Sequence, residues 1–171
     1  PPALPHLRPS PHPKQQTSIM SSNLKSLIYD PDNSSTCSTP TLQVLDQLLL
    51  PHTQTYISIQ GELSAYDVIT NMTVRGAPLI AIVALLALSI SLHQRSPNSL
   101  NDVLSKMEYL KSSRPTAVNL ANAISELTKI LKENESSGSG FSSRQCVEIV
   151  KTYAEALLAK DLTSNLALGS H

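Results

Sequence analysis

The apolar run from Ala77 to Leu92 constrains the fold of this chain more than any other segment. It contains no charged side chain, and it is shorter than the ~20 residues that a transmembrane helix needs. It also lies far from the N-terminus and lacks the layout of a signal peptide. We therefore interpret the run as a buried core helix, around which the rest of the chain must pack.

Three short segments before this helix have the composition of β-strands. Residues 24–30 and 41–51 each end at a proline, and residues 55–59 are rich in β-branched side chains. Residues 31–40, between the first two segments, are turn-forming throughout. Because a short loop joins the second and third segments, we expect an antiparallel sheet of about three strands.

After these segments the apolar residues recur with the period of an α-helix. Pro78 suits the first turn of the core helix, where the missing N–H of proline costs nothing. Five helices are predicted, at residues 62–72, 77–93, 99–113, 114–134 and 143–169. The expected fold class is therefore α+β, with a small antiparallel sheet followed by a bundle of about five helices.

The apolar spacing also predicts which helix faces turn toward the core. In residues 62–72 the spaced apolar positions are Leu63, Tyr66, Ile69 and Met72. In residues 99–113 they are Leu100, Val103, Leu104, Met107 and Leu110. In residues 114–134 they are Val118, Ala121, Ile124, Leu127 and Ile130. We expect these side chains to form the inward faces of the three helices.

The two ends of the chain differ in character. Residues 1–19 hold six of the twelve prolines, and such a stretch is expected to be disordered. Met20 follows, and we hypothesise that it is the natural start of the protein. Helical apolar spacing continues nearly to His171, so we expect the chain to be the front of something longer.

Composition argues against several classes of function. The 13 basic and 13 acidic residues balance, and there is no Trp and only one Phe, which disfavours nucleic-acid binding. Cys37 and Cys146 belong to no metal-ligand cluster, which disfavours a zinc site or a disulfide framework. We interpret them as free thiols in a reducing compartment.

The segment VRGAP at the start of the core helix is the first candidate site. Helix N-termini expose unpaired N–H groups that attract anions, and Arg75 adds a guanidinium suited to phosphate. Gly76 and Ala77 leave room for a ligand to approach the backbone. The segment is thus a candidate cradle for a phosphorylated small molecule. The alternative is a loop arginine paired with a local acid beside a glycine that the turn needs.

A second segment has the same order of residues. In SSRPTAVNL, residues 112–120, Arg114 precedes a proline and then a helix start. Two such junctions in one domain suggest that both face one anionic ligand. The alternative is two independent helix starts with no shared ligand.

Four segments together resemble the N-terminal part of the methylthioribose-1-phosphate isomerase family. They are VLDQLLLPHTQTYISI, MTVRGAPLIAIVALLALSI, SSRPTAVNLANAI and DLTSNLALGSH. The resemblance covers residues 24–171 in order, and it places residues 20–171 in the N-terminal domain of that family. The superfamily also contains the regulatory subunits of translation initiation factor 2B and ribose-1,5-bisphosphate isomerase.

The resemblance implies a methionine-salvage enzyme that converts 5-methylthioribose 1-phosphate to 5-methylthioribulose 1-phosphate. It implies a cytoplasmic location, with the nucleus as a second compartment. It also implies a homodimer of subunits about twice this length, with no metal, no cofactor, no membrane and no nucleic-acid partner. A Rossmann-like C-terminal domain of the family is not contained in this chain.

Four positions match substrate contacts of the family, namely Arg75, Gly76, Ala77 and Arg114. The catalytic cysteine and aspartate of the family would lie beyond His171. Cys37, Cys146 and Asp161 match neither of them, so no catalytic residue is assigned. The resemblance therefore implies a phosphosugar-binding chain that is catalytically silent by itself.

Two other functions remain open. The chain could act as a non-catalytic regulatory or binding module, as the initiation-factor relatives do. It could also be a truncated gene product without function, whose exposed apolar face would favour aggregation. A cysteine motif and a later aspartate in the continuing sequence would favour the enzyme.

Overall fold

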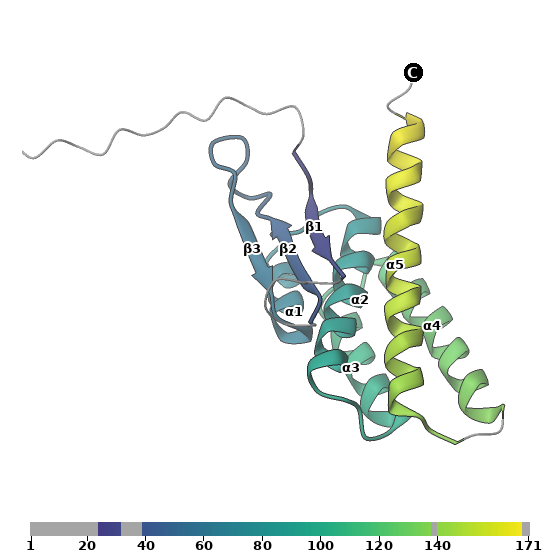
Figure 1. Ribbon diagram of the computed structural model, residues 1–171. Helices are drawn as coiled ribbons and strands as arrows, with labels where there is room; N and C mark the ends of the chain where they lie inside the picture. The colour runs from purple at the N-terminus through teal and green to yellow at the C-terminus, as the bar shows by residue number, and fades with distance from the viewer. Residues whose placement is uncertain (1–23, 32–38, 138–139, 169–171) are drawn as a thin grey trace, which may run out of the picture.

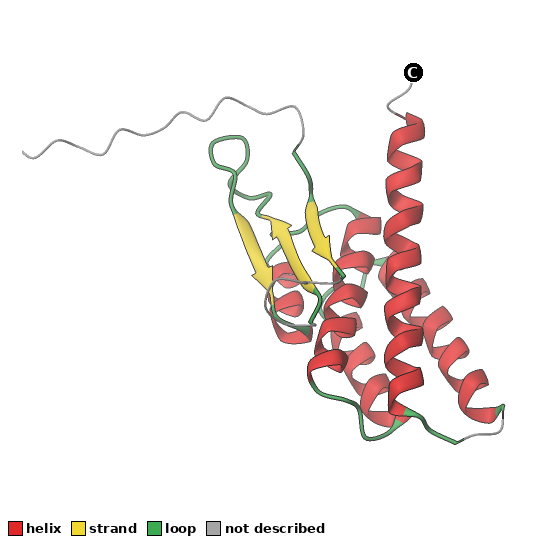
Figure 2. Ribbon diagram, viewed as in Figure 1, coloured by secondary structure: helices red, strands yellow, loops and turns green. Residues whose placement is uncertain are grey.

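The sheet and the helices follow one another along the chain, and the sheet lies along one side of the helix bundle (Figure 1, Figure 2). A computed structural model of the protein describes residues 24–31, 39–137 and 140–168. The predictions for residues 1–19, Met20 and Cys37 fall outside these ranges. Three strands and five helices within the described ranges confirm the predicted α+β class.

The strands β1 (Leu27–Asp30), β2 (Thr41–Leu45) and β3 (Tyr56–Ile59) form an antiparallel sheet in the order β1-β2-β3. Alternate side chains of a strand point to opposite faces. In β2, Leu42 and Val44 are therefore buried, whereas Gln43 between them is exposed. Leu42 lies opposite Ile59 of β3, so the inward positions of both strands coincide.

The central helix of the bundle is α2, which was predicted from its apolar run. The helices are α1 (Glu62–Thr70), α2 (Ala77–Gln94), α3 (Leu100–Ser112), α4 (Val118–Ser136) and α5 (Ser143–Leu168). All four other helices and β2 contact α2. By length and composition α2 could cross a membrane, yet 72% of it is buried inside the protein, as befits a core helix.

The prediction of a strand over residues 41–51 is wrong in its second half. The strand ends at Leu45, and the next residues form turns with Leu48 and Leu49 exposed. Asp46 accounts for the break, because its side-chain oxygen accepts the Leu48 N–H at 3.0 Å. An aspartate that bonds the backbone two residues ahead forms a turn in place of a strand ladder.

The predicted inward face of α1 is wrong at both ends. Leu63 is 66% exposed, and Met72 lies beyond the helix and is also exposed. The buried residues are Ala65, Val68 and Ile69. The small side chain of Ala65 faces the core, so the inward stripe is not the one marked by the largest apolar residues.

The same kind of error affects α4, although its inner positions are right. Val118 is 66% exposed, whereas Ile124 and Leu127 are buried as predicted. The buried residues of the helix are Leu120, Ala123, Ile124, Leu127 and Leu131. For α3 the prediction is confirmed, except that Leu104 is only half-buried.

Candidate functional site

The two arginine-containing junctions lie near each other in the fold. The hydroxyl of Thr70, at the end of α1, donates to the carbonyl of Ser113, at the end of α3, at 3.4 Å. Thr70 leads into the junction before α2, and Ser113 leads into the junction before α4. Helices α2 and α4 also pack against each other, so both helix starts belong to one region of the surface.

The start of α2 is built on Gly76, the N-cap residue. Its φ of 98° and ψ of 124° suit glycine, because a side chain is strained at that φ. A Cβ added to Gly76 would meet only Leu79, at 3.9 Å, so the space beside this backbone is open. No described side chain caps the helix, and its first turn holds no acidic residue. The N–H groups of this turn therefore keep their attraction for an anion.

The side chain of Arg75 is exposed and lies along its own loop. Its Nε donates to the carbonyl of Met72 at 3.3 Å, and its backbone N–H donates to Oε1 of Gln47 at 3.1 Å. No ion pair involves Arg75 within the described ranges. The acid partner of the alternative is therefore absent among the described residues, whereas the positive φ of Gly76 agrees with its other part, a glycine that the turn needs.

The start of α4 repeats these features with different residues. Ala117 is the N-cap, no side chain of the described residues caps it, and the first turn is again free of acid. Arg114 is half-buried and its carbonyl accepts the Ala117 N–H at 3.0 Å. Its guanidinium makes no ion pair with the part of the chain that the structure describes.

Helices α1 and α3 begin differently. In α1 the hydroxyl of Ser64 accepts the Gly61 N–H at 3.2 Å, and Glu62 adds a negative charge to the first turn. In α3 the hydroxyl of Ser99 accepts the Asp102 N–H at 3.2 Å, and Asp102 supplies the charge. Both helices thus carry a first-turn acid, and α3 has a serine cap as well, so these two helix starts attract an external anion less than those of α2 and α4 do.

A groove of about 470 Å³ lies between α2, α4 and α5, beside both uncapped helix starts. Its apolar residues are Pro78, Ala81, Ile82, Ala123 and Leu157. Its polar residues are Asn119, Asn122, Glu126, Tyr153, Lys160, Asp161, Ser164 and Asn165. Pro78 belongs to the first turn of α2 and Asn119 to the first turn of α4. A cavity of this size is typical of small-molecule sites.

The four residues predicted to contact substrate are adjacent to this groove in sequence, but they do not line it. Arg75, Gly76 and Ala77 immediately precede Pro78, and Arg114 lies five residues before Asn119, in the loop that leads into α4. The structure thus brings the two helix starts to one groove. The assignment of the four residues as ligand contacts stays a prediction.

One hydrogen bond joins the two helices that flank the groove. The hydroxyl of Tyr153 on α5 donates to Oε2 of Glu126 on α4 at 2.8 Å. Burial raises the pKa of Tyr153, and the hydrogen bond and negative charge of Glu126 raise it further. The tyrosine therefore keeps its proton near neutral pH and continues to hold the Glu126 carboxylate in place.

The sequence does contain a signal for the groove, although it was missed. Asn119, Asn122 and Glu126 recur at intervals of three and four residues along α4. Such a spacing places polar side chains on one face of a helix. The corresponding residues of α5 are Tyr153, Leu157, Lys160, Asp161 and Ser164. The two polar faces meet only in the tertiary structure, and residue spacing within one helix cannot predict that contact.

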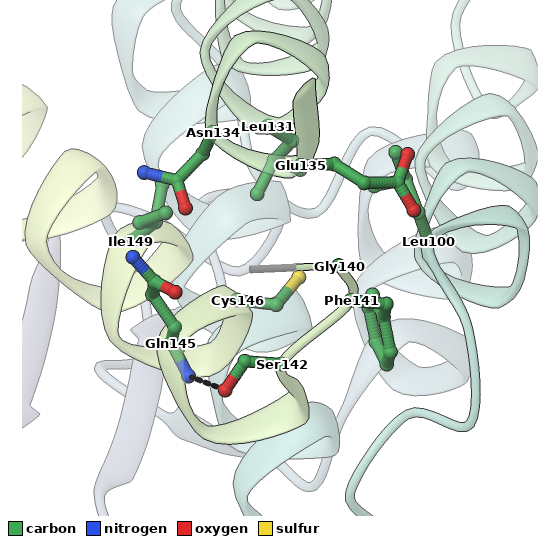
Figure 3. Close-up of a pocket in the computed structure, with 10 residues that line it drawn as sticks. All are labelled: Leu100, Leu131, Asn134, Glu135, Gly140, Phe141, Ser142, Gln145, Cys146 and Ile149. Atoms are coloured by element: carbon green, nitrogen blue, oxygen red, sulfur yellow. Dashed lines mark hydrogen bonds between the residues drawn. The ribbon is translucent and has the colours of Figure 1, made fainter. Parts of the chain in front are cut away.

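A second, much smaller cavity surrounds Cys146 at the turn between α4 and α5 (Figure 3). At about 20 Å³ it has room for about one water. Cys146 is a free thiol, as predicted, and burial raises its pKa to about 11. A buried thiol with a raised pKa is a poor nucleophile. Within the described residues no group of His, Cys, Asp or Glu could hold a metal ion.

Comparison with known proteins identifies relatives of this chain. The model of the initiation factor 2 subunit family matches residues 73–170. The methylthioribose-1-phosphate isomerase of Meyerozyma guilliermondii is 43% identical over 131 residues, which are 77% of this chain and 32% of the relative. That of Schizosaccharomyces japonicus is 42% identical over 86% of this chain and 37% of its own length. The chain thus spans about a third of these curated relatives.

Solved structures share the fold. The crystal structure of 5-methylthioribose 1-phosphate isomerase from Pyrococcus horikoshii matches with a TM-score of 0.72 and 24% identity, over 88% of this chain and 40% of that one. Subunit delta of the translation initiation factor eIF-2B from A. fulgidus matches with a TM-score of 0.62 and 24% identity, over 82% and 38%. At such identities the likeness concerns the fold alone.

Proposed function

The chain belongs to the initiation factor 2 subunit family, and we propose that it is the phosphosugar-binding N-terminal part of a methylthioribose-1-phosphate isomerase. The reaction is the conversion of 5-methylthioribose 1-phosphate to 5-methylthioribulose 1-phosphate. Curated relatives at 40–43% identity carry the isomerase name, which supports this branch of the family over a regulatory module. The family resemblance inferred from the residues is confirmed.

One observation of the structure carries the proposal. Helices α2 and α4 both begin without a capping side chain or a first-turn acid, each shortly after an arginine, beside the same groove. Two helix N-termini and two guanidinium groups form an environment for a doubly charged phosphate.

The chemistry of the substrate limits what these residues contribute. A phosphate on the anomeric carbon locks the sugar, so isomerisation requires ring opening followed by transfer of hydrogen between carbons 2 and 1. Arg75 and Arg114 orient the phosphate and supply proximity. An arginine stays protonated in proteins, so neither residue serves as a general base. We therefore assign phosphate binding to the two arginines and the proton transfers to other groups.

Calorimetric titration of the 171-residue chain with 5-methylthioribose 1-phosphate tests the proposal. We expect binding, and we expect Arg75→Ala and Arg114→Ala each to weaken it at least about tenfold, because each removes a charge-assisted hydrogen bond to phosphate. Arg95→Ala is the matched control, since Arg95 is an exposed arginine at the opposite end of α2. Equal losses in all three variants, or no binding by the unaltered chain, would contradict the proposal.

A further inference from the structure

The loop that follows β2 contacts the junction that carries Arg75. The backbone N–H of Gln47, in this loop, donates to the carbonyl of Thr73 at 3.1 Å. The side-chain Oε1 of the same glutamine accepts the backbone N–H of Arg75, also at 3.1 Å. Gln47 therefore bonds to two alternate residues of the junction, as a residue of one strand bonds to a neighbouring strand. Its side-chain amide takes the place that a backbone carbonyl would have in a sheet.

The bond to Arg75 depends on the chemistry of the glutamine side chain. A backbone N–H is a donor, so the atom of Gln47 that faces it must be the amide oxygen. An apolar side chain of the same length would offer no acceptor there. Gln47 is half-buried, so its amide oxygen is partly shielded from water, which strengthens the bond.

The loop that carries Gln47 is itself held by hydrogen bonds. The N–H of Asp46 donates to the carbonyl of Thr55 at 2.8 Å, which joins the two ends of the loop at the sheet. The carboxylate of Asp46 accepts the Leu48 N–H at 3.0 Å, which fixes the turn around Gln47. Gln47 is therefore a defined anchor for the segment that it bonds.

The junction is also held on its other side. Val74 is fully buried, and its N–H donates to the carbonyl of Val68 in α1 at 3.2 Å. The Nε of Arg75 donates to the carbonyl of Met72 at 3.3 Å. The two terminal amino groups of the Arg75 guanidinium bond to no residue in the part of the chain that the structure describes. These two groups are the ones that remain for a ligand.

We propose that Gln47 is a positioning residue for the phosphate site, because it holds the backbone of Arg75 and so sets the direction in which the guanidinium meets a ligand. This inference rests on the proposed function, which gives Arg75 its phosphate. Gln47 is not among the residues that line the groove, so it acts through Arg75 and not by touching the substrate. Without its amide oxygen the junction would be less ordered before binding, and ordering it would then reduce the affinity.

A double-mutant cycle, measured by calorimetric titration of the 171-residue chain with 5-methylthioribose 1-phosphate, tests the inference. Gln47→Met keeps the length of the side chain but removes its acceptor, and it should weaken binding about threefold to tenfold. In the Arg75→Ala background the same exchange should have no further effect, because the guanidinium that Gln47 positions is already absent. A role of Gln47 in the fold alone would weaken binding equally in both backgrounds.

Gln43→Met is the matched control, since Gln43 is an exposed glutamine of the preceding strand β2. It should leave the affinity unchanged. Amide hydrogen exchange supplies a readout that needs no ligand, because the Arg75 N–H should exchange faster in Gln47→Met and not in Gln43→Met. Thermal unfolding of each variant sets the temperature of the titrations, so that a loss of folded protein is not taken for a loss of affinity.

The outcomes separate the inference from the proposed function. If Arg75→Ala weakens binding but Gln47→Met does not, the inference falls alone. Equal losses from Gln47→Met in both backgrounds, or unchanged exchange of the Arg75 N–H, would also overturn it. If the unaltered chain does not bind the phosphosugar, the proposed function falls and the inference falls with it. A loss that occurs only where Arg75 is present, together with faster exchange of its N–H, supports both.

Discussion

Helices α1 and α3 begin in one way, and α2 and α4 begin in another. The first pair carries a first-turn acid, Glu62 in α1 and Asp102 in α3, and the hydroxyl of Ser99 also caps α3. The second pair receives neither and follows Arg75 and Arg114. Such a cap contributes about 0.5–2 kcal/mol of stability. Helices α2 and α4 lack both features beside the groove, in agreement with the proposed phosphate binding there, so we refer to them as the binding pair and to α1 and α3 as the folding pair.

The largest effect on stability is expected from breaking the ion pair that joins α1 to α3. The ammonium of Lys106 on α3 pairs with the carboxylate of Glu62 on α1 and also donates to the hydroxyl of Ser91 on α2 at 3.3 Å. Both charged side chains are mostly buried. Lys106→Met leaves Glu62 without its partner and should cost about 2–3 kcal/mol, below the range for fully buried pairs. Urea unfolding at neutral pH measures this.

The control and the pH dependence sharpen that prediction. Lys111→Met removes an exposed pair with Glu108 and should change stability by less than about 0.5 kcal/mol. Burial raises the pKa of Glu62, whereas hydrogen bonds from Lys106 and Ser91 lower it. The lowering is the larger effect, so the pKa of Glu62 in the folded protein lies below its ordinary value of 4.5. The Lys106–Glu62 pair therefore stabilises the fold fully at a pH above the ordinary pKa of glutamate. This stabilisation is lost as the pH falls through the lower pKa that Glu62 has in the folded protein. The difference between wild type and Lys106→Met should shrink on acidification, and a constant difference would contradict the assignment.

The next effect concerns the glycine of the binding pair. Gly76→Ala meets no steric obstacle, so its cost of about 1–2 kcal/mol should come from the positive φ alone. Gly140 also has a positive φ, of 70°, with open space around it, and Gly140→Ala should cost a similar amount. Only Gly76→Ala should weaken binding of the phosphosugar, because its methyl group occupies the approach to the backbone. Equal affinities of the two variants would show that no ligand approaches Gly76.

Serine caps allow a smaller and more local comparison. Ser99→Ala removes the hydroxyl that accepts the Asp102 N–H, and it should lower the free energy of unfolding by about 1 kcal/mol. Ser105, in the middle of the same helix, bonds only the carbonyl of Asn101, so Ser105→Ala should be nearly neutral. Thermal unfolding distinguishes the two. Phosphosugar binding should be unchanged in both, and a loss of binding in Ser99→Ala would remove the distinction between the two pairs of helices.

The sequence predicted those features that depend on local residue order. The Gly76–Pro78 start of α2 and its long apolar run specify a core helix without reference to any other segment. The features that the sequence did not predict depend on side chains that compete for backbone hydrogen bonds, or on tertiary packing. Asp46 ends β2 by a side-chain hydrogen bond, and Ala65 lies on the buried face of α1 whereas Leu63 is exposed.

The candidate site was predictable in part, for the same reason. The order arginine, proline, helix occurs at Arg75 and at Arg114, and it marked both helix starts before any fold was known. The groove beside them was not predicted, because Asn122 and Leu157 come together only when α4 packs near α5 across α2. Their helical spacing indicates a face, whereas the partner of that face is a property of the assembled bundle.

The smallest expected effect gives the sharpest test, because stability and affinity should change in opposite directions. Asn119→Asp places a negative charge in the first turn of α4 with almost no change of shape, and it should stabilise the fold by about 0.3–1 kcal/mol through the helix dipole. The same charge should repel a phosphate at that helix start. Affinity for inorganic phosphate should therefore fall while the melting temperature rises.

The matched control is Asn101→Asp, which makes the same exchange at the second residue of α3. It should leave phosphate affinity unaltered, and its gain in stability should be smaller, because Ser99 and Asp102 already satisfy that helix start. If Asn119→Asp raised stability without weakening phosphate binding, the uncapped start of α4 would have no role in binding phosphate. If affinity falls only in Asn119→Asp, the missing cap is explained, because a helix start filled by its own acid is closed to a ligand of the same charge.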